Sequence, residues 1–350
     1  MKVLVAGGAG YIGSHTVVEL VKAGHEPVIV DNFSNSKETV IDRLEEITGT
    51  HLTWYRADLA DQSLTRAIFE KETPDAVIHF AGYKAVGESV EQPLDYYENN
   101  LNTTFSIARA MIASGCDTIV FSSSATVYGD AELPLTESEP HLDSLSPYGY
   151  TKVAGERILT DIAQAHDLKL GLLRYFNPVG ADASGRIGEN PLGRPNNLMP
   201  AVAKVAAGRQ DKLLIFGDDY PTRDGSAIRD YLHVTDLAKA HVVALEKLGG
   251  FDSSVKIWNL GTGKGTSVFE LVAAFEQACG FELAKEVAPR RAGDRAEIYA
   301  TPTLALEELG WQTELTIEDM CTDTWRWQSN NPDGYPDGEA QSTPSSVNAS

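Results

Sequence analysis

The chain of 350 residues contains little cysteine, little positive charge and no long apolar run. Its three cysteines, Cys116, Cys279 and Cys321, lie far apart without metal-ligand spacing, so we expect reduced thiols, a cytoplasmic protein and no metal site. No apolar run approaches the roughly 20 residues of a transmembrane helix. The first expected strand begins at Lys2, which leaves no room for a signal peptide.

Positive charge is scarce, with 29 Lys and Arg against 50 Asp and Glu and a net charge of −21. Such a surface would repel nucleic acid and anionic membranes, so neither is an expected partner. Any positive charge that binds an anionic ligand must therefore be local, and single arginines in glycine-rich loops become informative. The composition is otherwise ordinary for a folded protein, at 42% hydrophobic residues.

Four glycines, by contrast, gather within seven residues near the N-terminus, in Gly7–Gly13. Lys2–Ala6 reads as an apolar strand, and helical spacing begins at Tyr11, so the glycines lie on a strand-to-helix turn. Gly8-x-Gly10-x-x-Gly13 matches the fingerprint in which missing side chains let a pyrophosphate approach backbone N–H groups. This pattern predicts a dinucleotide site.

Two acidic residues at expected strand ends bear on the nucleotide. Asp31 follows a strand over Pro27–Val30, about 20 residues after the glycine loop. The carboxylate that binds the adenosine 2′-hydroxyl in dinucleotide-binding folds has the same spacing. Because Asp31 would repel a 2′-phosphate, NAD is preferred over NADP. Asp58 is positioned to meet the adenine amino group, but capping the helix that opens at Asp61 is an equally weighted alternative.

Strands and helices alternate through the first 175 residues, which predicts parallel strands joined by right-handed crossovers. We expect an α/β fold: an NAD-binding Rossmann domain (a doubly wound parallel sheet) over 1–175, to which 233–260 returns. Past residue 175 the alternation fails, which indicates a smaller C-terminal α/β region, 176–232 and 261–338, that binds another ligand. Residues 339–350 have the composition of a disordered tail.

The strand that ends at His79 leads into Phe80–Lys84, where small residues suit a backbone that passes a cofactor and Lys84 could reach its phosphates. The helix expected over Pro93–Ser114 carries Asn99 and Asn100. If these asparagines are buried they need partners, which cofactor or loop backbone could supply.

Tyr148 and Lys152 are spaced i, i+4 and so project from one face of an expected helix. A nearby ammonium, like the positive ring of oxidised nicotinamide, favours phenolate, and a fall of about three units from a pKa near 10 would make Tyr148 a base near neutrality. Ser124, at a strand end, could hold a substrate oxygen and pass the proton. Alone, Tyr-x-x-x-Lys is common and usually structural; after a dinucleotide loop and five βα units it predicts a catalytic site.

These motifs resemble those of the extended short-chain dehydrogenase/reductases and, within them, the UDP-hexose 4-epimerases, over residues 1 to about 338. The carriers are Gly7–Gly13, Asp31-Asn32, Phe80–Ser89, Phe121–Gly129, Ser146–Gly149 with Lys152, Tyr175–Pro178, Pro195–Pro200, Arg229–Val234 and Arg290–Asp294. The resemblance implies galactose metabolism. Tyr148 would take the proton of the sugar 4-hydroxyl, directly or through Ser124, while hydride passes to NAD. The resulting 4-keto sugar would then rotate about its diphosphate linkage and present its other face. The returning hydride would invert carbon 4, so NAD stays bound between turnovers.

The resemblance also implies the ligand contacts. The cofactor contacts are Gly7, Gly10, Tyr11, Ile12, Gly13, Asp31, Asn32, Phe33, Ser34, Asn35, Ser36, Asp58, Leu59, Phe80, Ala81, Gly82, Lys84, Asn99, Ser122, Tyr148, Lys152 and Phe176. The UDP-sugar contacts are Lys84, Ser124, Tyr148, Asn177, Asn197, Leu198, Leu214, Phe216, Arg229, Tyr231, Arg291, Asp294 and Ile298. Forked arginine donors suit a diphosphate, although a surface salt bridge is the alternative for Arg229 and Arg291.

Related enzymes give the competing hypotheses. Nucleotide-sugar 4,6-dehydratases carry an Asp-Glu pair where this chain has Ala125-Thr126, and UDP-glucuronate decarboxylases usually carry a Glu there, so epimerisation is favoured. An NAD-sensing regulator would need no Tyr-Lys pair. Ile298 stands where epimerases restricted to non-acetylated sugars tend to have a bulky aromatic, which predicts at least slow turnover of UDP-N-acetylglucosamine. If the family position corresponds to the adjacent Tyr299 instead, this prediction changes. The resemblance further suggests a homodimer through the helices at 93–114 and 148–166.

Overall fold

Seven parallel strands form the central sheet of the computed structural model, which describes residues 1–140, 142–191, 197–291 and 294–347. The strand order is β11-β6-β5-β4-β1-β2-β3, the doubly wound order with one further strand at the β6 edge. The strands are β1 (Lys2–Ala6), β2 (Glu26–Asp31), β3 (Thr53–Arg56), β4 (Ala76–His79), β5 (Thr118–Ser124), β6 (Lys169–Tyr175) and β11 (Val255–Leu260). The predicted fold class is confirmed.

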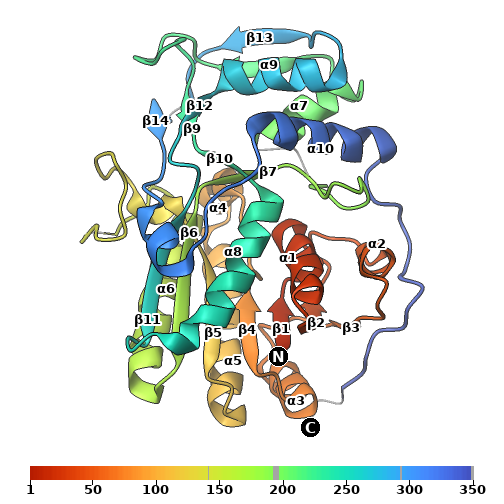
Figure 1. The fold of residues 1–350 in the computed structure, drawn as a ribbon, viewed down its shortest axis with the longest axis vertical. Helices are drawn as coiled ribbons and strands as arrows, with labels where there is room; N and C mark the ends of the chain where they lie inside the picture. Colours follow the sequence, from red (N-terminus) through yellow and green to blue (C-terminus); the bar gives the residue numbers. More distant parts are fainter. Residues whose placement is uncertain (141, 192–196, 292–293, 348–350) are drawn as a thin grey trace.

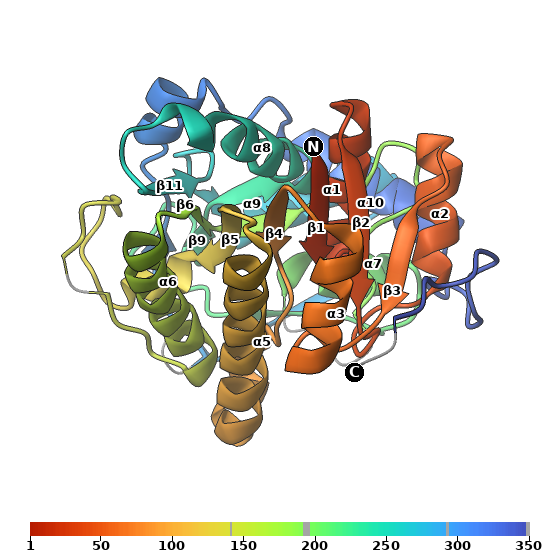
Figure 2. The same ribbon diagram turned by 90° about the horizontal axis from the view of Figure 1, so that it is seen from below.

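Helices cover both faces of this sheet (Figures 1 and 2). One face carries α1 (Tyr11–Lys22), α2 (Thr39–Thr48) and α8 (Val234–Lys247). The other carries α3 (Gln62–Glu72), α5 (Pro93–Ser114) and α6 (Pro147–His166), with the short α4 (Val86–Glu91) packed against α5 and α6.

The central strands are apolar because both of their faces are buried. In β1, Val3 and Val5 pack into the core beneath α1, α2 and α8, whereas Leu4 and Ala6 pack into the core beneath α3, α5 and α6. Successive side chains of a strand point to opposite faces, so a strand between two helical layers reads as a continuous apolar run. The polar residues that follow each run therefore mark the carboxyl edge of the sheet.

A smaller region lies beyond that edge, at the top of Figure 1. Its helices are α7 (Leu198–Ala206), α9 (Val268–Cys279) and α10 (Ile317–Asn330), which share a third apolar core. Its short strands pair as β7 (Asn177–Val179) with β10 (Tyr231–His233), and β8 (Leu213–Phe216) with β13 (Lys285–Ala288). A third sheet joins β9 (Ile228–Arg229) to β12 (Thr266–Ser267) and β14 (Glu297–Ile298).

Three short helical segments complete the chain: η1 (Ala125–Tyr128), η2 (Leu248–Gly250) and the π-type η3 (Ala305–Leu309). Of the segment expected to be a disordered tail, residues 339–347 lie as coil against α2 and β3. Parts of three predicted segments lie outside the described residues. These are residues 348–350 of the tail, Pro195 and Asn196 of the motif Pro195–Pro200, and Ala292 and Gly293 of the motif Arg290–Asp294.

Candidate active site

The glycine loop joins β1 to α1 and allows two close approaches of the backbone. A Cβ atom on Gly13 would lie 2.2 Å from the carbonyl oxygen of Gly7, and Gly7 itself has a φ of 78°. A Cβ on Gly7 would lie 2.9 Å from the backbone nitrogen of Ala81, in the loop after β4. Gly10 caps α1 without a side-chain hydrogen bond, so the first N–H groups of the helix are left for a ligand, and the loop fits a pyrophosphate.

Asp31 connects the glycine loop to the loop after β2. Its Oδ2 accepts from the N–H of Ala9 at 3.0 Å, and its Oδ1 accepts from the N–H of Phe33 at 2.8 Å and the hydroxyl of Ser36 at 3.0 Å. Burial raises the pKa of the Asp31 carboxyl, while these hydrogen bonds favour the carboxylate. The structure thus places residues 31–36 beside the glycines, as an adenosine site requires.

Asp58 follows β3 and reaches the same loop. Its Oδ2 accepts from the side-chain amide of Asn32 at 3.3 Å, and its Oδ1 accepts from the N–H of Ala60 at 2.9 Å. The N-cap of α3 is instead Asp61, which accepts from the N–H groups of Ser63 and Leu64. The helix-cap alternative for Asp58 is therefore wrong, and its exposed carboxylate faces the loop of residues 32–36.

The loop after β4 is held by Asn100, which is buried. Its side-chain oxygen accepts from the N–H of Tyr83 at 2.8 Å, and its amide donates to the carbonyl of Tyr83 at 3.1 Å and to Thr151 at 3.0 Å. The loop backbone is therefore the partner that a buried asparagine needs here. The half-buried Asn99 donates to Asn100, and Lys84 pairs with Glu189 at 3.4 Å.

The Tyr148–Lys152 pair lies on the first turns of α6, facing the end of β5. Burial raises the pKa of the Tyr148 hydroxyl to about 12, and a hydrogen bond with Ser124 offsets part of that rise. Lys152 donates from its Nζ to the carbonyl oxygen of Ser122 at 2.7 Å and to its hydroxyl at 3.3 Å. In the protein alone, then, Lys152 is occupied by Ser122, and the expected lowering of the Tyr148 pKa needs a further positive charge.

Burial also lowers the pKa of Lys152, to about 8, against the opposing effect of the Glu156 carboxylate. At neutral pH the side chain remains mainly a cation. It lies 4.9 Å from the ring of Phe121, which adds a cation–π contact to its two hydrogen bonds. The site therefore contains a buried positive charge, held by Ser122 and Phe121 one helical turn after Tyr148.

An ion pair that the sequence did not reveal lies one helical turn further along α6. Glu156 accepts from Arg174 of β6 through both carboxylate oxygens, at 2.9 and 2.6 Å, and both side chains are almost completely buried. Ser123 also donates to Glu156. One indication of this pair is present in the sequence: Glu156 is four residues after Lys152 and so lies on the same face of the helix. Its partner Arg174 lies on β6, which the spacing could not indicate.

The proposed nucleotide-binding residues gather in the smaller region. Leu214 and Phe216 are alternate residues of β8 and so share one face, and the Arg291 guanidinium lies 3.9 Å from the centre of the Phe216 ring. Arg229 pairs with Asp294 at 3.1 Å and donates to the backbone oxygens of Ile228 and Arg295. Arg229 thus forms a salt bridge, but only 14% of its side chain is exposed, so it is not an ordinary surface pair.

Ile298 lies on β14, beside Arg229 of β9. It packs against the apolar cluster that contains Val127 and Phe176, next to the end of β5. The neighbouring Tyr299 points elsewhere, because a Cβ added to Gly265 would lie 3.6 Å from its ring. Of these two residues, Ile298 is the one that packs against the cluster beside the end of β5.

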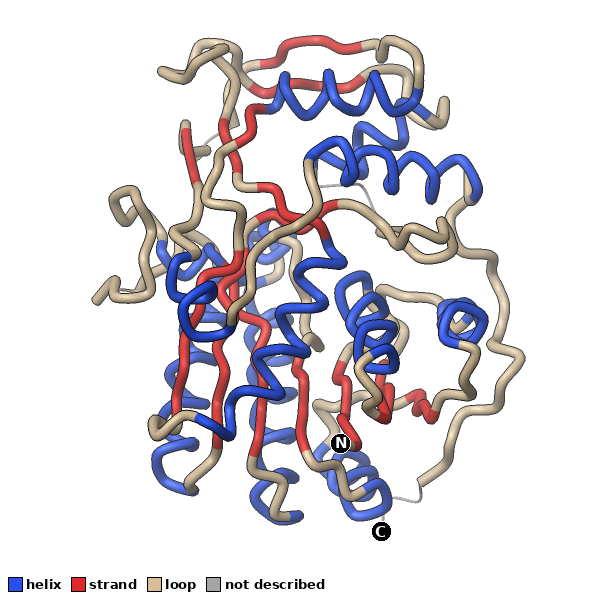
Figure 3. Tube along the Cα trace, in the orientation of Figure 1, coloured by secondary structure: helices blue, strands red, loops and turns tan. Residues whose placement is uncertain are grey.

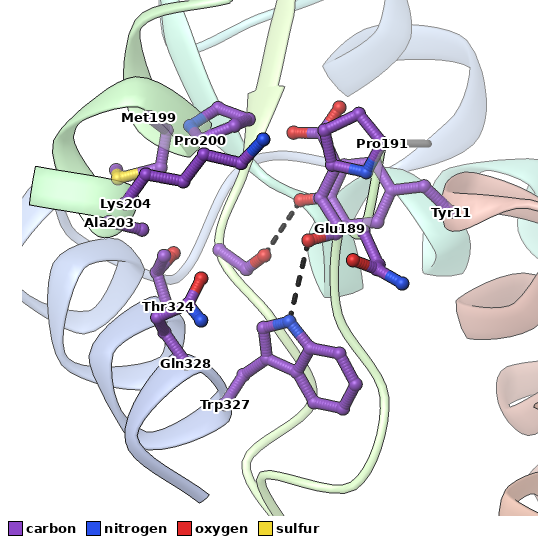
Figure 4. Close-up of a pocket in the computed structure, with 12 residues that line it drawn as sticks. Tyr11, Glu189, Pro191, Met199, Pro200, Ala203, Lys204, Thr324, Trp327 and Gln328 are labelled. Atoms are coloured by element: carbon purple, nitrogen blue, oxygen red, sulfur yellow. Dashed lines mark hydrogen bonds between the residues drawn. The ribbon is translucent and has the colours of Figure 1, made fainter. Parts of the chain in front are cut away.

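Tyr11, the first residue of α1, connects the cofactor side to the smaller region. Its hydroxyl donates to the carbonyl of Gly180 at 2.7 Å, and Figure 4 shows it beside a small cavity between α7 and α10. On the opposite wall, the indole N–H of Trp327 donates to the carbonyl of Glu189 at 3.4 Å. This junction fixes the start of α1 against the loop that carries Glu189, the partner of Lys84.

Among the described residues, no cluster of acidic, histidine or cysteine side chains has the arrangement of a metal site. Nor is any helix of the described chain both long and apolar enough to cross a membrane.

Replacing Glu156 with Gln should lower the free energy of unfolding by about 3–5 kcal/mol, because it leaves the Arg174 cation buried without a counter-charge. Replacing both residues with Met should recover much of that loss. Urea unfolding of the two variants measures the difference. A Glu156→Gln protein within about 1 kcal/mol of the parent would show that the pair does not hold α6 on the sheet.

Comparison with known proteins agrees with this geometry. The NAD dependent epimerase/dehydratase family matches residues 3–261. The chain is 53% identical over 341 residues to the UDP-glucose 4-epimerase of Bacillus subtilis, covering 97% of this chain and 100% of that protein, and 51% identical over 342 residues to that of Mus musculus, covering 95% and 98%.

A crystal structure of UDP-glucose 4-epimerase from Bifidobacterium longum in complex with NAD+ and UDP superposes with a TM-score of 0.91 at 47% identity. The match covers 96% of this chain and 100% of that one. The resemblance inferred from the motifs is therefore confirmed at the level of the family. The chain belongs to the NAD dependent epimerase/dehydratase family.

Proposed function

We propose that this protein is an NAD-dependent 4-epimerase that interconverts UDP-glucose and UDP-galactose. The observation that carries the proposal is the meeting of Tyr148, Lys152 and Ser124 at the end of β5, in a fold whose glycine loop fits a dinucleotide. The relatives with this name align over almost the whole chain, so the proposal covers the catalytic domain and the smaller region together.

The proposed cofactor residues are those of the glycine loop, those at the ends of β2, β3, β4, β5 and β6, and Asn99 of α5. Gly7, Gly10 and Gly13 would admit the pyrophosphate, Asp31 and Asp58 with the 32–36 loop would hold the adenosine, and Phe80–Lys84, Asn99, Ser122 and Phe176 would line the rest. When bound, oxidised NAD supplies a hydride acceptor for sugar carbon 4 and a positive ring beside the phenol. Asp31 would exclude a 2′-phosphate by charge.

Tyr148 is the proposed acid–base residue. Its burial disfavours phenolate, and the hydrogen bond with Ser124 offsets part of that penalty. Tyr148 would need the further positive charge of the bound nicotinamide ring when it takes the proton of the sugar 4-hydroxyl. The same hydroxyl then returns the proton to the ketone oxygen from the other face. Ser124 holds the substrate oxygen in place through both transfers.

A dehydratase or decarboxylase reaction is disfavoured by η1. Ala125 has no acid, and the backbone N–H and hydroxyl of Thr126 both donate to Ser124, at 3.2 and 3.0 Å. Thr126 therefore orients the serine and supplies no carboxylate that could move protons at carbons 5 and 6. The reaction of this site is limited to transfers at one carbon.

The smaller region would hold the uridine diphosphate. The half-buried face of Leu214 and Phe216, with Arg291 over the ring, suits a stacked base, whereas Arg229 beside Asp294 is placed for the diphosphate. Asn177, Asn197, Leu198 and Tyr231 complete the proposed contacts.

Incubating the purified protein with UDP-galactose, without added NAD, should yield UDP-glucose, because hydride removed from the sugar is returned to it. Replacing Tyr148 with Phe should reduce kcat by a factor of about 10²–10⁴, the usual contribution of a positioned acid–base group, while NAD remains bound. Chromatography of the products and of the extracted cofactor measures both. No UDP-glucose from protein with verified bound NAD would refute the proposal.

We also propose that UDP-N-acetylglucosamine and UDP-N-acetylgalactosamine are at least slow substrates, because Ile298 is smaller than a tyrosine at the catalytic end. Replacing Ile298 with Tyr should remove the acetylated activity and spare most of the hexose activity. Assaying both sugar pairs on both proteins tests this. An undetectable acetylated activity in the parent enzyme would refute it.

A homodimer is proposed from exposed apolar side chains on α4, α5 and the start of α6. Leu94 and Leu145, the latter just before α6, are 72% and 62% exposed, and Val90, Phe105, Ile112 and Tyr150 are also exposed. Replacing Leu94 with Glu should give monomers in sedimentation experiments, whereas Leu306→Glu, an exposed leucine on η3, should not. A parent protein that is monomeric at micromolar concentration would contradict the proposal.

A cytoplasmic location is proposed because Cys116, Cys279 and Cys321 are all free thiols. Cell fractionation is the direct check.

A further inference from the structure

The chain beyond α10 crosses from the smaller region back to the NAD-binding side. Residues 336–347, here called the C-terminal strap, run as coil past α2 and β3 towards α3 (Figures 1 and 3). The carbonyl of Pro336 accepts from the Thr39 hydroxyl at 3.0 Å, and the N–H of Gln341 donates to Asp42 at 2.8 Å. Asp337 pairs with Lys37. The strap is therefore bound to the first half of α2, directly after the 32–36 loop.

The strap then covers β3, the edge strand of the sheet. The N–H of Ser345 donates to the carbonyl of Trp54 at 2.8 Å, and the indole N–H of Trp54 donates to the hydroxyl of Ser342 at 3.1 Å. Beyond it, Lys71 of α3 donates to the carbonyl of Ser346 at 3.2 Å, and Val347 packs against the core on that face. These contacts attach the strap to the sheet as well as to α2.

Phe33 lies in the proposed adenosine loop, and two of its neighbours are side chains of β3. Phe33 has a φ of 57°, a left-handed conformation that a bulky residue keeps only when its surroundings hold it there. The Trp54 ring meets it edge-on at 5.7 Å, and the Arg56 guanidinium lies 5.7 Å from its ring centre.

The strap supports both neighbours of Phe33. Trp54 is bound by Ser342 and Ser345, as described above. Arg56 pairs with the buried carboxylate of Glu38, which also accepts from the N–H of Ala340 at 3.3 Å. Removing the strap would therefore take one hydrogen-bond partner from the Trp54 indole and one from Glu38, the partner of Arg56.

We propose that the C-terminal strap is a positioning element for the adenosine loop and slows the release of NAD. This rests on the proposed function, in which NAD is held between turnovers. A loop already held in its binding conformation loses less conformational freedom when the ligand binds, so the complex is tighter and dissociates more slowly. Because the strap contacts described above lie on α2, β3 and α3, we expect its effect on the adenosine half of the cofactor.

The test compares the full chain with a chain that ends at Gly338 and a matched control that ends at Val347, which keeps every contact described above. Truncation at Gly338 should speed the exchange of bound NAD for labelled NAD on the order of tenfold, the effect of one or two net hydrogen bonds. Affinity for ADP-ribose should fall by a similar factor. Affinity for UDP, which would bind the smaller region, should stay unchanged.

Two full-length variants serve if the shorter chain does not fold. Ala340→Pro removes the N–H that reaches Glu38, and Ser342→Ala removes the partner of the Trp54 indole; each should speed NAD exchange by a smaller factor. Unchanged exchange in these proteins, or an equal loss of UDP affinity, would overturn the inference. A full-length protein that binds no NAD would instead refute the proposed function.

Discussion

The site depends on how closely α6 packs on the end of β5. Three consecutive serines of the strand meet three helix residues spaced one turn apart: Ser124 with Tyr148, Ser122 with Lys152, and Ser123 with Glu156. A helix can satisfy three adjacent strand residues only at short range, and glycines permit it. A Cβ on Gly155 would lie 2.8 Å from the Phe121 ring, and one on Gly149 would lie 3.1 Å from the Cβ of Thr126, just after β5. Moving α6 outward by the width of a methyl group would therefore disturb every one of these contacts at once.

The buried ion pair explains why this packing can carry a charged lysine. Lys152 is a cation in an apolar setting, and burial lowers its pKa to about 8. The Glu156–Arg174 pair adds no net charge, yet its negative member lies on the same helix face as Lys152, and its positive member lies on the neighbouring strand β6. The Glu156–Arg174 ion pair thus attaches the helix to the sheet, and removing either partner would lower the free energy of unfolding strongly. Lys152 instead donates hydrogen bonds to the hydroxyl and carbonyl of Ser122. On this face of α6, Glu156 contributes to stability, whereas Tyr148 and Lys152 are the proposed catalytic residues.

What the sequence predicted was local in origin. Tyr148 with Lys152, the glycine loop and Asp31 each follow from spacing within one βα unit, so the doubly wound fold and its strand ends were predictable. Contacts between distant segments were not. Arg174 contacts Glu156, and Tyr175 contacts Ser122, because β6 lies beside β5 in the sheet. The sequence left open whether Asp58 caps a helix, and only the structure shows that Asp61 is the N-cap of α3. The polar composition of residues 339–347 suggested a disordered tail, because composition reports how little apolar surface a segment can bury and not whether folded elements offer hydrogen-bond partners to its backbone.

The two ends of the substrate site differ in how firmly they can hold a ligand. At the nucleotide end lie a cationic side chain on an aromatic ring, Arg291 on Phe216, and the ion pair of Arg229 with Asp294. At the proposed catalytic end lie the hydroxyls of Ser124 and Tyr148 and an apolar wall that includes Val127 and Ile298. A ligand bound strongly through its nucleotide and weakly through its sugar can turn the sugar without leaving the protein. This is the arrangement that inversion at one carbon requires, since both faces of the same carbon must in turn meet one fixed hydride acceptor and one fixed phenol.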